Sequence, residues 1–216
     1  MESAFRDTFP DGLSTDFRVI ETLGHAPGDS VRRLDRHLDR MTQTCARLGI
    51  AFDREQAAHL LAGVCGPRPL RLRLTVAPDG TITLQQAAMP PVRHDWRVAI
   101  APDTVWSGDP WLSVKTTQRA LYDHWRAAMP AGIDEMLFCN ETGALCEGTI
   151  TNLFVATEDG LLTPPRSSGA LPGVLRQELL EGGRAREAAL HPRDLYHAQA
   201  IWLGNSLRGL IRAELA

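Results

Sequence analysis

Apolar side chains recur at helical spacing in the first quarter of the chain. From Leu34 to Leu48 they follow one another at steps of four, three, four and three residues, which predicts an amphipathic helix over about 34–48. Gly49 comes next and is a typical helix end. Asp53 is expected to cap a second helix that runs to about Val64.

Short segments with alternating or continuous apolar residues predict strands along the rest of the chain. The turn signals at 78–80, 140–143 and 158–160 separate pairs of these segments and predict hairpins. The expected strands cover about 16–23, 69–77, 81–87, 96–101, 134–139, 144–148, 150–156, 161–163 and 199–203. Two more helices are expected, one over about 116–128 and one of about ten residues opened by Pro172-Gly173.

The order of these elements indicates an α+β fold of two unequal lobes rather than a repeating βαβ array. A small N-terminal α/β lobe is expected over 1–101. The stretch 102–110 is rich in Pro, Gly and Asp and is interpreted as a linker. A larger, β-rich lobe is expected over 111–216.

The composition is that of an ordinary soluble globular protein, with 44% apolar and 23% charged residues and a net charge of -3. Nothing in it calls for nucleic acid or a membrane as partner. The stretch Met1–Arg6 has no apolar signal-peptide region, and no apolar run reaches the ~20 residues of a membrane span, so a cytoplasmic protein is expected. The four cysteines lack CxxC spacing and the seven histidines lack paired spacing, so free thiols and no metal site are expected.

Lys115 is the single lysine among 23 lysines and arginines. A GC-rich genome would replace lysine codons by arginine codons, which explains why other lysines are absent but not why this one remains. A desolvated lysine loses its proton readily and attacks carbonyl groups to form a Schiff base, which arginine cannot do. Lys115 is therefore a candidate for a chemical role.

Further candidate groups follow Lys115 along the chain. Glu147 lies between β-forming segments beside Gly148, and a charge in that position needs a partner. The loop Leu171-Pro172-Gly173 delivers a helix N-terminus, which is a natural site for an anion. The turn at Gly204-Asn205-Ser206 offers further hydrogen-bond donors.

In their order, these segments resemble the motifs of the class IV aminotransferase family, the pyridoxal-phosphate enzymes of fold type IV. The family includes branched-chain aminotransferases, D-amino-acid aminotransferases and 4-amino-4-deoxychorismate lyases. The segments that carry the resemblance are Glu21-Thr22, His37-Leu38-Asp39-Arg40-Met41, Lys115-Thr116-Thr117, Glu147-Gly148-Thr149, Asn152-Leu153-Phe154, Leu171-Pro172-Gly173-Val174-Leu175-Arg176 and Asn205-Ser206-Leu207-Arg208-Gly209.

The resemblance implies a role for each candidate toward pyridoxal 5'-phosphate (PLP). Lys115 would form a Schiff base with the cofactor and later move the substrate proton. Glu147 would lie against the pyridine nitrogen and keep it protonated, which makes the ring a better electron sink. Arg40 would bind the phosphate. The remaining phosphate-site residues implied are Gly173, Val174, Leu175, Asn205 and Ser206.

For several of these residues, a purely structural role is an alternative to the role in binding. Arg40 also fits an ordinary ion pair, and Asn205 and Ser206 also fit plain turn formation. Glu21 and Thr22 are candidates for the wall of a substrate pocket. The alternating pair Arg71 and Arg73 fits either a site for a substrate carboxylate or a solvated strand face.

The segment Lys115–Arg119 and position 120 resemble the lyase branch. Branched-chain aminotransferases usually carry a tyrosine five residues after the lysine, where this chain has Ala120. Tyr122 follows two residues later, and on a helix it faces about 200° away from position 120. A lyase that eliminates pyruvate from 4-amino-4-deoxychorismate is the leading prediction. The alternatives are an aminotransferase acting on branched-chain or D-amino acids and a non-catalytic descendant that binds PLP or a small amine. The family also implies a homodimer.

Overall fold

The computed structural model describes residues 13–28 and 31–216, which form two compact units. Unit 1 contains the described residues up to Pro91 together with the segment Val114–Gln118. Unit 2 contains Val92–Ser113 and Arg119–Ala216. The mixture of helices with a larger, β-rich second unit confirms the predicted fold class.

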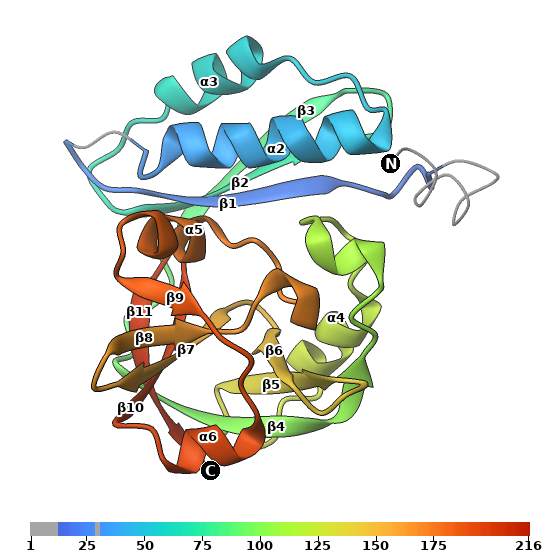
Figure 1. Cartoon of the computed structure of the whole chain (residues 1–216). Helices are drawn as coiled ribbons and strands as arrows, with labels where there is room; N and C mark the ends of the chain where they lie inside the picture. Colours follow the sequence, from blue (N-terminus) through green and yellow to red (C-terminus); the bar gives the residue numbers. More distant parts are fainter. Residues whose placement is uncertain (1–12, 29–30) are drawn as a thin grey trace. The chain divides into compact units, whose positions relative to one another are not determined.

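Unit 1 is a three-stranded antiparallel sheet with two helices along one face (Figure 1). Its strands are β1 (Val19–His25), β2 (Leu70–Val76) and β3 (Ile82–Ala88), in the order β1-β2-β3. The helices are α2 (Leu34–Leu48) and α3 (Arg54–Ala62). Buried residues alternate along β2, because one face of this strand packs in the core and the other does not.

The predictions for unit 1 are confirmed closely. Helix α2 has the expected bounds and ends at Gly49, whose φ of 68° lies in the left-handed region that glycine adopts without cost. The Asp53 side chain caps α3 by accepting a hydrogen bond from the Gln56 amide at 2.8 Å. The β2–β3 hairpin turns at 78–80, where Gly80 has a φ of 86°.

Unit 2 is built on an eight-stranded sheet in the order β10-β11-β4-β5-β6-β7-β8-β9. An additional pairing of β10 with β7 closes six of the strands into a ring. The strands are β4 (Asp95–Val105), β5 (Glu135–Asn140), β6 (Leu145–Gly148), β7 (Asn152–Thr157), β8 (Gly160–Thr163), β9 (Ala185–Glu187), β10 (Ala200–Asn205) and β11 (Gly209–Leu215). One core cluster takes a buried side chain from every strand of the ring: Val98, Leu137, Leu145, Leu153, Leu203 and Ile211.

Three helices belong to unit 2: α4 (Ala120–Ala127), α5 (Val174–Glu181) and α6 (Pro192–Tyr196). Helix α4 packs through Tyr122 against Met136 and Phe138 of β5. Helix α5 packs through Leu175 and Leu179 against Phe154 of β7. Short 3-10 turns lie at Pro110–Ser113 and Arg166–Ser168.

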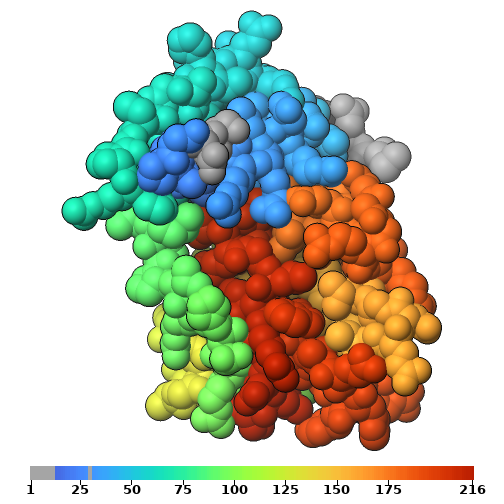
Figure 2. All heavy atoms as spheres, turned by 90° about the vertical axis from the view of Figure 1, so that its left-hand side faces the viewer, coloured from blue at the N-terminus to red at the C-terminus, as the bar shows by residue number. Residues whose placement is uncertain are grey.

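The predicted domain boundaries differ from the structure. The stretch 102–110 is not a linker between lobes, because β4 continues to Val105 and the stretch belongs to unit 2. The strand expected at 96–101 belongs to unit 2 as well, since β4 pairs in parallel with β5 and β11. In the space-filling view, the C-terminal strands run beside the green segment that contains β4 (Figure 2).

Three elements of unit 2 were not predicted from the sequence: β9 (Ala185–Glu187), α6 (Pro192–Tyr196) and β11 (Gly209–Leu215). Strand β11 follows Gly209, whose φ of 74° suits the turn from β10 into β11. The first residues of the helix expected at 116–128 are not helical, because Thr116 forms a bridge with Val19 and α4 begins only at Ala120.

The four cysteines are free; Cys45, Cys139 and Cys146 are buried and Cys65 is exposed. No helix in the part of the chain that the structure describes is long and apolar enough to cross a membrane. The stretch Met1–Arg6, in which no signal-peptide region was expected, lies outside the described residues.

Candidate active site

Glu147 is a buried carboxylate with hydrogen-bond donors on both oxygens. Its Oε1 accepts from the Tyr122 hydroxyl at 3.2 Å. Its Oε2 accepts from Asn152 Nδ2 at 3.2 Å and from the Leu171 amide at 3.0 Å. The predicted need of Glu147 for partners is therefore confirmed, and its orientation is fixed by groups from α4, β7 and the loop before α5.

Tyr122, two residues after Ala120 on α4, faces Glu147. The expected turn of about 200° is counted from position 120; α4 begins there with an exposed Ala120 and carries Tyr122 on its buried side. Burial, followed by the charge of Glu147, raises the pKa of Tyr122 above its ordinary value. The hydroxyl therefore stays protonated and acts as a donor to the carboxylate.

Asn152 links the carboxylate to the N-terminus of α5. Its Nδ2 donates to Leu171 O at 2.9 Å as well as to Glu147. Gly173, the residue before α5, lies so close that an added Cβ would overlap Asn152 Oδ1. Glycine at 173 is therefore required for this approach of α5 to β7.

The N-terminus of α5 has the features of an anion site. The helix has no acidic residue in its first turn, and Gly173 provides no side-chain cap. The first amides of a helix lack partners within the helix, so those of Val174 and Leu175 are available to a bound anion. Gly204 of β10 brings a second backbone close, since a Cβ there would come within 2.9 Å of Leu175 Cδ2.

Asn205 takes part in the turn after β10, in line with the alternative interpretation. Its Nδ2 donates to Ile150 O at 3.2 Å, and its Oδ1 accepts from the Arg208 amide at 2.9 Å. Ser206 is buried beside it. Both residues thus lie in unit 2 with Glu147 and α5, where Asn205 shapes the backbone of the turn.

In unit 1, Arg40 and Glu21 form a forked ion pair. Arg40 Nε donates to Glu21 Oε1 at 2.7 Å and Nη2 donates to Oε2 at 2.6 Å, while His37 Nδ1 lies 2.6 Å from Oε2. Burial alone would raise the pKa of Glu21, but the charges and hydrogen bonds of Arg40 and His37 outweigh it and lower that pKa to about 2. Glu21 is thus a buried anion that orients Arg40, rather than an open wall of a substrate pocket.

Lys115 lies in unit 1 beside β1. Its carbonyl accepts a hydrogen bond from the Ile20 amide at 2.9 Å, and the Thr117 amide donates to Arg18 O at 2.9 Å. These bonds hold the segment beside β1, and Lys115 is half-buried. Glu21 is the next residue after Ile20, whose amide donates to the Lys115 carbonyl.

The remaining candidates of unit 1 lie along the same sheet. Thr22 of β1 is half-buried and pairs with Arg73 of β2, and Gly24 pairs with Arg71. Arg71 is exposed and Arg73 is half-buried. Both arginines lie on the face of β2 opposite its buried leucines, as the solvated-face interpretation expects.

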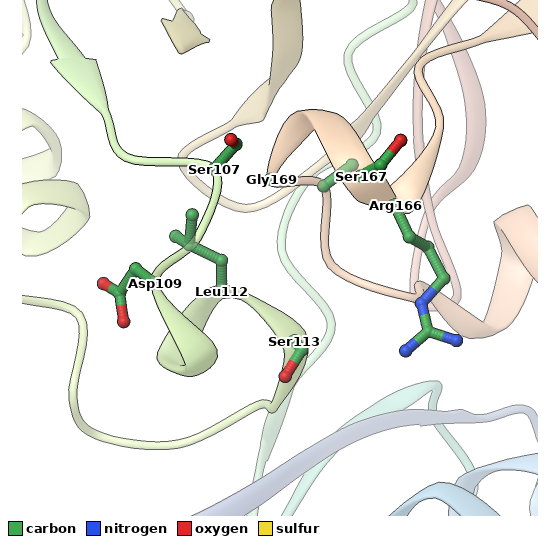
Figure 3. A pocket seen from close by; sticks show the side chains of 8 residues that line it. Ser107, Asp109, Leu112, Ser113, Arg166, Ser167 and Gly169 are labelled. Atoms are coloured by element: carbon green, nitrogen blue, oxygen red, sulfur yellow. The ribbon is translucent and has the colours of Figure 1, made fainter. Parts of the chain in front are cut away.

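Unit 2 also contains a pocket of about 310 Å³ between the segments 107–113 and 166–170 (Figure 3). Asp109 and Arg166 lie at opposite sides of it. Ser107, Asp109 and Ser113 already hydrogen bond within the protein, to Glu141, the Trp111 amide and Pro110 O. None of the residues predicted from the sequence lines this pocket.

The predicted site residues thus form two clusters. Lys115, Arg40, Glu21, Thr22, Arg71 and Arg73 belong to unit 1, and Glu147, Gly173, Val174, Leu175, Asn205 and Ser206 belong to unit 2. Tyr122, as a donor to Glu147, was missed, and Asn152 was noticed only as part of a motif. A polar residue that opens an otherwise apolar strand, as Asn152 does, is the signal that would have marked it.

The buried carboxylate and the glycine-opened helix N-terminus of unit 2, and the single lysine of unit 1, are groups of the kind that PLP-dependent enzymes use. The family model for amino-transferase class IV matches residues 18–215. The chain therefore belongs to the class IV aminotransferase family, whose members depend on PLP.

Curated relatives of the chain carry two kinds of name. The aminodeoxychorismate lyase of Saccharomyces cerevisiae is 28% identical over 56% of this chain and 37% of its own length. A Schizosaccharomyces pombe protein, provisionally named aminodeoxychorismate lyase, is 26% identical over 84% of this chain and 83% of its own. The branched-chain-amino-acid aminotransferase of Escherichia coli is 31% identical over 35% of this chain and 26% of its own. The chain thus spans well under half the length of the Saccharomyces cerevisiae and Escherichia coli proteins.

Solved structures share the fold over nearly the whole chain. A Mesorhizobium loti protein, provisionally named an amino-acid aminotransferase, is 41% identical, with a TM-score of 0.87 over 93% of this chain and 100% of that one. The PLP-bound form of a Mycobacterium tuberculosis protein of this fold is 24% identical, with a TM-score of 0.78 over 92% of this chain and 81% of that one.

The residues of unit 2 fit PLP. Glu147 presents a buried carboxylate of the kind that a protonated pyridine nitrogen needs as a partner. The glycine at 173 leaves the N-terminus of α5 open beside Asn152, as a phosphate-binding backbone requires. Unit 1, by itself, contains the chain's one lysine and an arginine whose orientation Glu21 fixes.

Proposed function

We propose that the protein is a PLP-dependent lyase that converts 4-amino-4-deoxychorismate into 4-aminobenzoate and pyruvate. The observation that carries the proposal is the exposed Ala120 at the start of α4, where branched-chain aminotransferases usually carry a tyrosine, while Tyr122 of this chain bonds to Glu147 instead. The tyrosine follows Lys115 by seven residues rather than by the five of branched-chain aminotransferases. Two lyase-named relatives support the same branch of the family, one of them along most of the chain.

In this proposal, Lys115 holds the cofactor covalently and provides the only lysine amine that can move a proton. The Lys115 Nζ would remove the proton from the carbon that bears the substrate's amine. The bound cofactor supplies an electron sink for the negative charge that develops there. Lys115 can then return a proton to the departing enolpyruvyl group.

The reaction balances without an oxidant or a second substrate. One carbon–hydrogen bond and one carbon–oxygen bond of 4-amino-4-deoxychorismate break, and the enolpyruvyl group leaves and becomes pyruvate. The ring that remains is aromatic, which drives the elimination. The protein's task is therefore to orient the ring and hold the proton on Lys115.

The other assigned residues bind and orient. Glu147 would keep a proton on the pyridine nitrogen, and Tyr122 and Asn152 would hold its carboxylate in place. Arg40, with Glu21 against one edge of its guanidinium, would pair with the phosphate. The amides of Val174 and Leu175 would complete the phosphate site.

Amino transfer to a 2-oxo acid is the second candidate function. The observation that favours it is the likeness to the Mesorhizobium loti protein, which shares 41% of its residues with this chain over its whole length. Both candidates need the same residues for the first proton transfer. They differ in the fate of the substrate's amino nitrogen, which would stay on the aromatic product of the lyase and would pass to the 2-oxo acid in amino transfer.

Product analysis separates the two candidates. The PLP-loaded protein is supplied with 4-amino-4-deoxychorismate while pyruvate and 4-aminobenzoate are quantified. In parallel it is supplied with leucine or D-alanine and 2-oxoglutarate while glutamate is quantified. Equal amounts of pyruvate and 4-aminobenzoate support the lyase, and glutamate formation without pyruvate overturns it. The Lys115→Ala variant is the control for both assays.

A further inference from the structure

Glu135, the first residue of β5, is a fully buried carboxylate that none of the roles above uses. Its Oε1 accepts hydrogen bonds from the Thr149 amide at 3.0 Å and from the Thr149 hydroxyl. Its Oε2 accepts from the Ile150 amide at 3.2 Å and from Thr151 Oγ1 at 3.0 Å. Four donors from three consecutive residues thus converge on one side chain.

These donors make up the turn between β6 and β7. Strand β6 ends at Gly148 and β7 begins at Asn152, so residues 149–151 connect the two strands. The Gly148 amide also donates to Thr151 O at 2.8 Å. The turn therefore wraps around the Glu135 carboxylate, which takes the place that water or a side-chain cap would otherwise fill.

Gly148 shows how tightly the turn and the carboxylate fit. A Cβ at this position would lie 2.8 Å from Glu135 Cγ and 2.6 Å from Thr151 Oγ1. Any side chain at 148 would have to displace Glu135 or the turn. Glu135 and Gly148 are thus parts of one packed arrangement.

The residues on either side of this turn, Glu147 and Asn152, meet at the Glu147 carboxylate, which is the group proposed to contact the cofactor. Glu147 and Asn152 are register partners across β6 and β7, and Asn152 Nδ2 donates to Glu147 Oε2. The conformation of 148–151 decides how the two strands meet at this pair. Arg126 Nη1 lies 3.8 Å from Glu135 Oε1, so the Arg126 guanidinium forms an ion pair with this carboxylate.

We propose that Glu135 is a positioning residue, whose carboxylate fixes the 148–151 turn so that Glu147 meets the pyridine nitrogen in a defined geometry. Glu135 does not itself touch the cofactor in this proposal, and it acts through the turn. The inference rests on the proposed binding of PLP. It predicts that loss of the Glu135 carboxylate weakens only the contact at the pyridine nitrogen and leaves the other contacts of PLP unchanged.

The test compares the affinities for PLP and for 1-deaza-PLP, in which a C–H replaces the pyridine nitrogen. The two molecules share the aldehyde and the phosphate, so the ratio of their dissociation constants reports only the contact at that nitrogen. Fluorescence titration of the apoprotein gives both constants. Because a hydrogen bond to a charged group contributes about 1.5–3 kcal/mol, we expect wild-type protein to prefer PLP by about tenfold or more.

Glu135→Gln keeps the size of the side chain but leaves the donors at one oxygen without an acceptor. We expect the preference for PLP to fall by about three- to tenfold. Glu147→Gln, which removes the proposed contact directly, should abolish the preference. Adding Glu135→Gln to Glu147→Gln should then change the ratio no further, because both substitutions act on one contact.

A Thr151 pair keeps the test decisive if Glu135→Gln does not fold. Thr151→Val removes one donor to Glu135 with little change in shape, and Thr151→Ser keeps the hydroxyl. The preference should fall in the first variant and be retained in the second. Affinities for PLP and 1-deaza-PLP that weaken equally in Glu135→Gln or in Thr151→Val would overturn the inference and leave the proposed function standing. Failure of the wild-type protein to bind PLP would overturn both.

Discussion

The hydroxyl of Tyr122 donates a hydrogen bond of 3.2 Å to Oε1 of Glu147, from a helix that begins five residues after Lys115. The residues in between do not continue that helix, because Thr116 and Thr117 are held against β1 of unit 1. The tyrosine therefore reaches the carboxylate from the first turn of a new helix. Lys115 and Tyr122, although close in sequence, belong to different units.

Replacing Tyr122 by phenylalanine should weaken the site without disturbing the packing. The Phe ring keeps the edge-on contact with Phe138, whose centroid lies 4.9 Å away, and only the donor to Glu147 is lost. We expect the free energy of unfolding to fall by about 1–2 kcal/mol and PLP to bind several-fold more weakly. Urea denaturation and PLP titration measure the two effects.

Tyr196→Phe is the matched control, because the Tyr196 side chain is 71% exposed. It should change the unfolding free energy by less than about 0.5 kcal/mol. Equal effects of the two substitutions would show that the Tyr122 hydroxyl does not hold Glu147.

Sequence periodicity predicted the elements of unit 1 well and the connections of unit 2 poorly. Helix α2 and the β2–β3 hairpin depend on local signals, namely an apolar stripe ended by Gly49 and a Pro-Asp-Gly turn. The start of α4 depends instead on a tertiary contact, since Thr116 bridges to Val19 from 97 residues earlier in the chain. A single sequence carries no signal for such a bridge.

Gly173→Ala should disturb Asn152 and, through it, Glu147. The new Cβ would overlap Asn152 Oδ1, and the Asn152 amide is held by Leu171 O and Glu147. Moving this side chain breaks both hydrogen bonds, so we expect a loss of about 1–3 kcal/mol in unfolding free energy and weaker PLP binding. Thermal unfolding with and without PLP measures both.

Gly63→Ala provides the control for the glycine substitution. Gly63 has a φ of -73°, and a Cβ there would come no closer than 3.7 Å to the carbonyl oxygens of His59 and Leu60. We expect an unchanged or slightly raised stability and unchanged cofactor affinity. A Gly173→Ala protein that behaves like Gly63→Ala would contradict the described arrangement around Asn152.

The Glu21 carboxylate should make unit 1 sensitive to acid. Its pKa of about 2 in the folded protein lies below the ordinary value of 4.5, despite burial, because Arg40 and His37 stabilise the anion. The unfolded chain therefore binds the proton more readily, and the stability that Glu21 contributes is present above about pH 4.5 and is lost as the pH falls toward 2. Urea denaturation at several pH values between 3 and 6 measures this slope.

Glu21→Gln should be less stable at neutral pH and should show a smaller loss between pH 5 and 3. Glu158→Gln removes an exposed carboxylate and is the control for losing one acidic group. A Glu21→Gln protein with the same acid dependence as the wild type would show that the Glu21–Arg40 pair does not govern it.

For the site, candidate residues could be named from the sequence, but the way they are held could not. Glu147 and Gly173 were predicted from a charge between strands and from a helix-opening glycine. Their supports, Tyr122 and the buried Glu135, depend on which elements pack together, and periodicity does not reveal that. Arg40 and Glu21 were predicted separately, and the structure joins them in one ion pair.

Borohydride reduction of the PLP-loaded protein tests the central claim, covalent attachment of the cofactor to Lys115, most directly. The protein should be yellow, and after reduction and proteolysis mass spectrometry should locate the phosphopyridoxyl group on the peptide that contains Lys115. Lys115→Arg keeps the positive charge and leaves the chain without a lysine amine, so it should carry no such label. A colourless protein, or a label found equally in Lys115→Arg, would contradict the account.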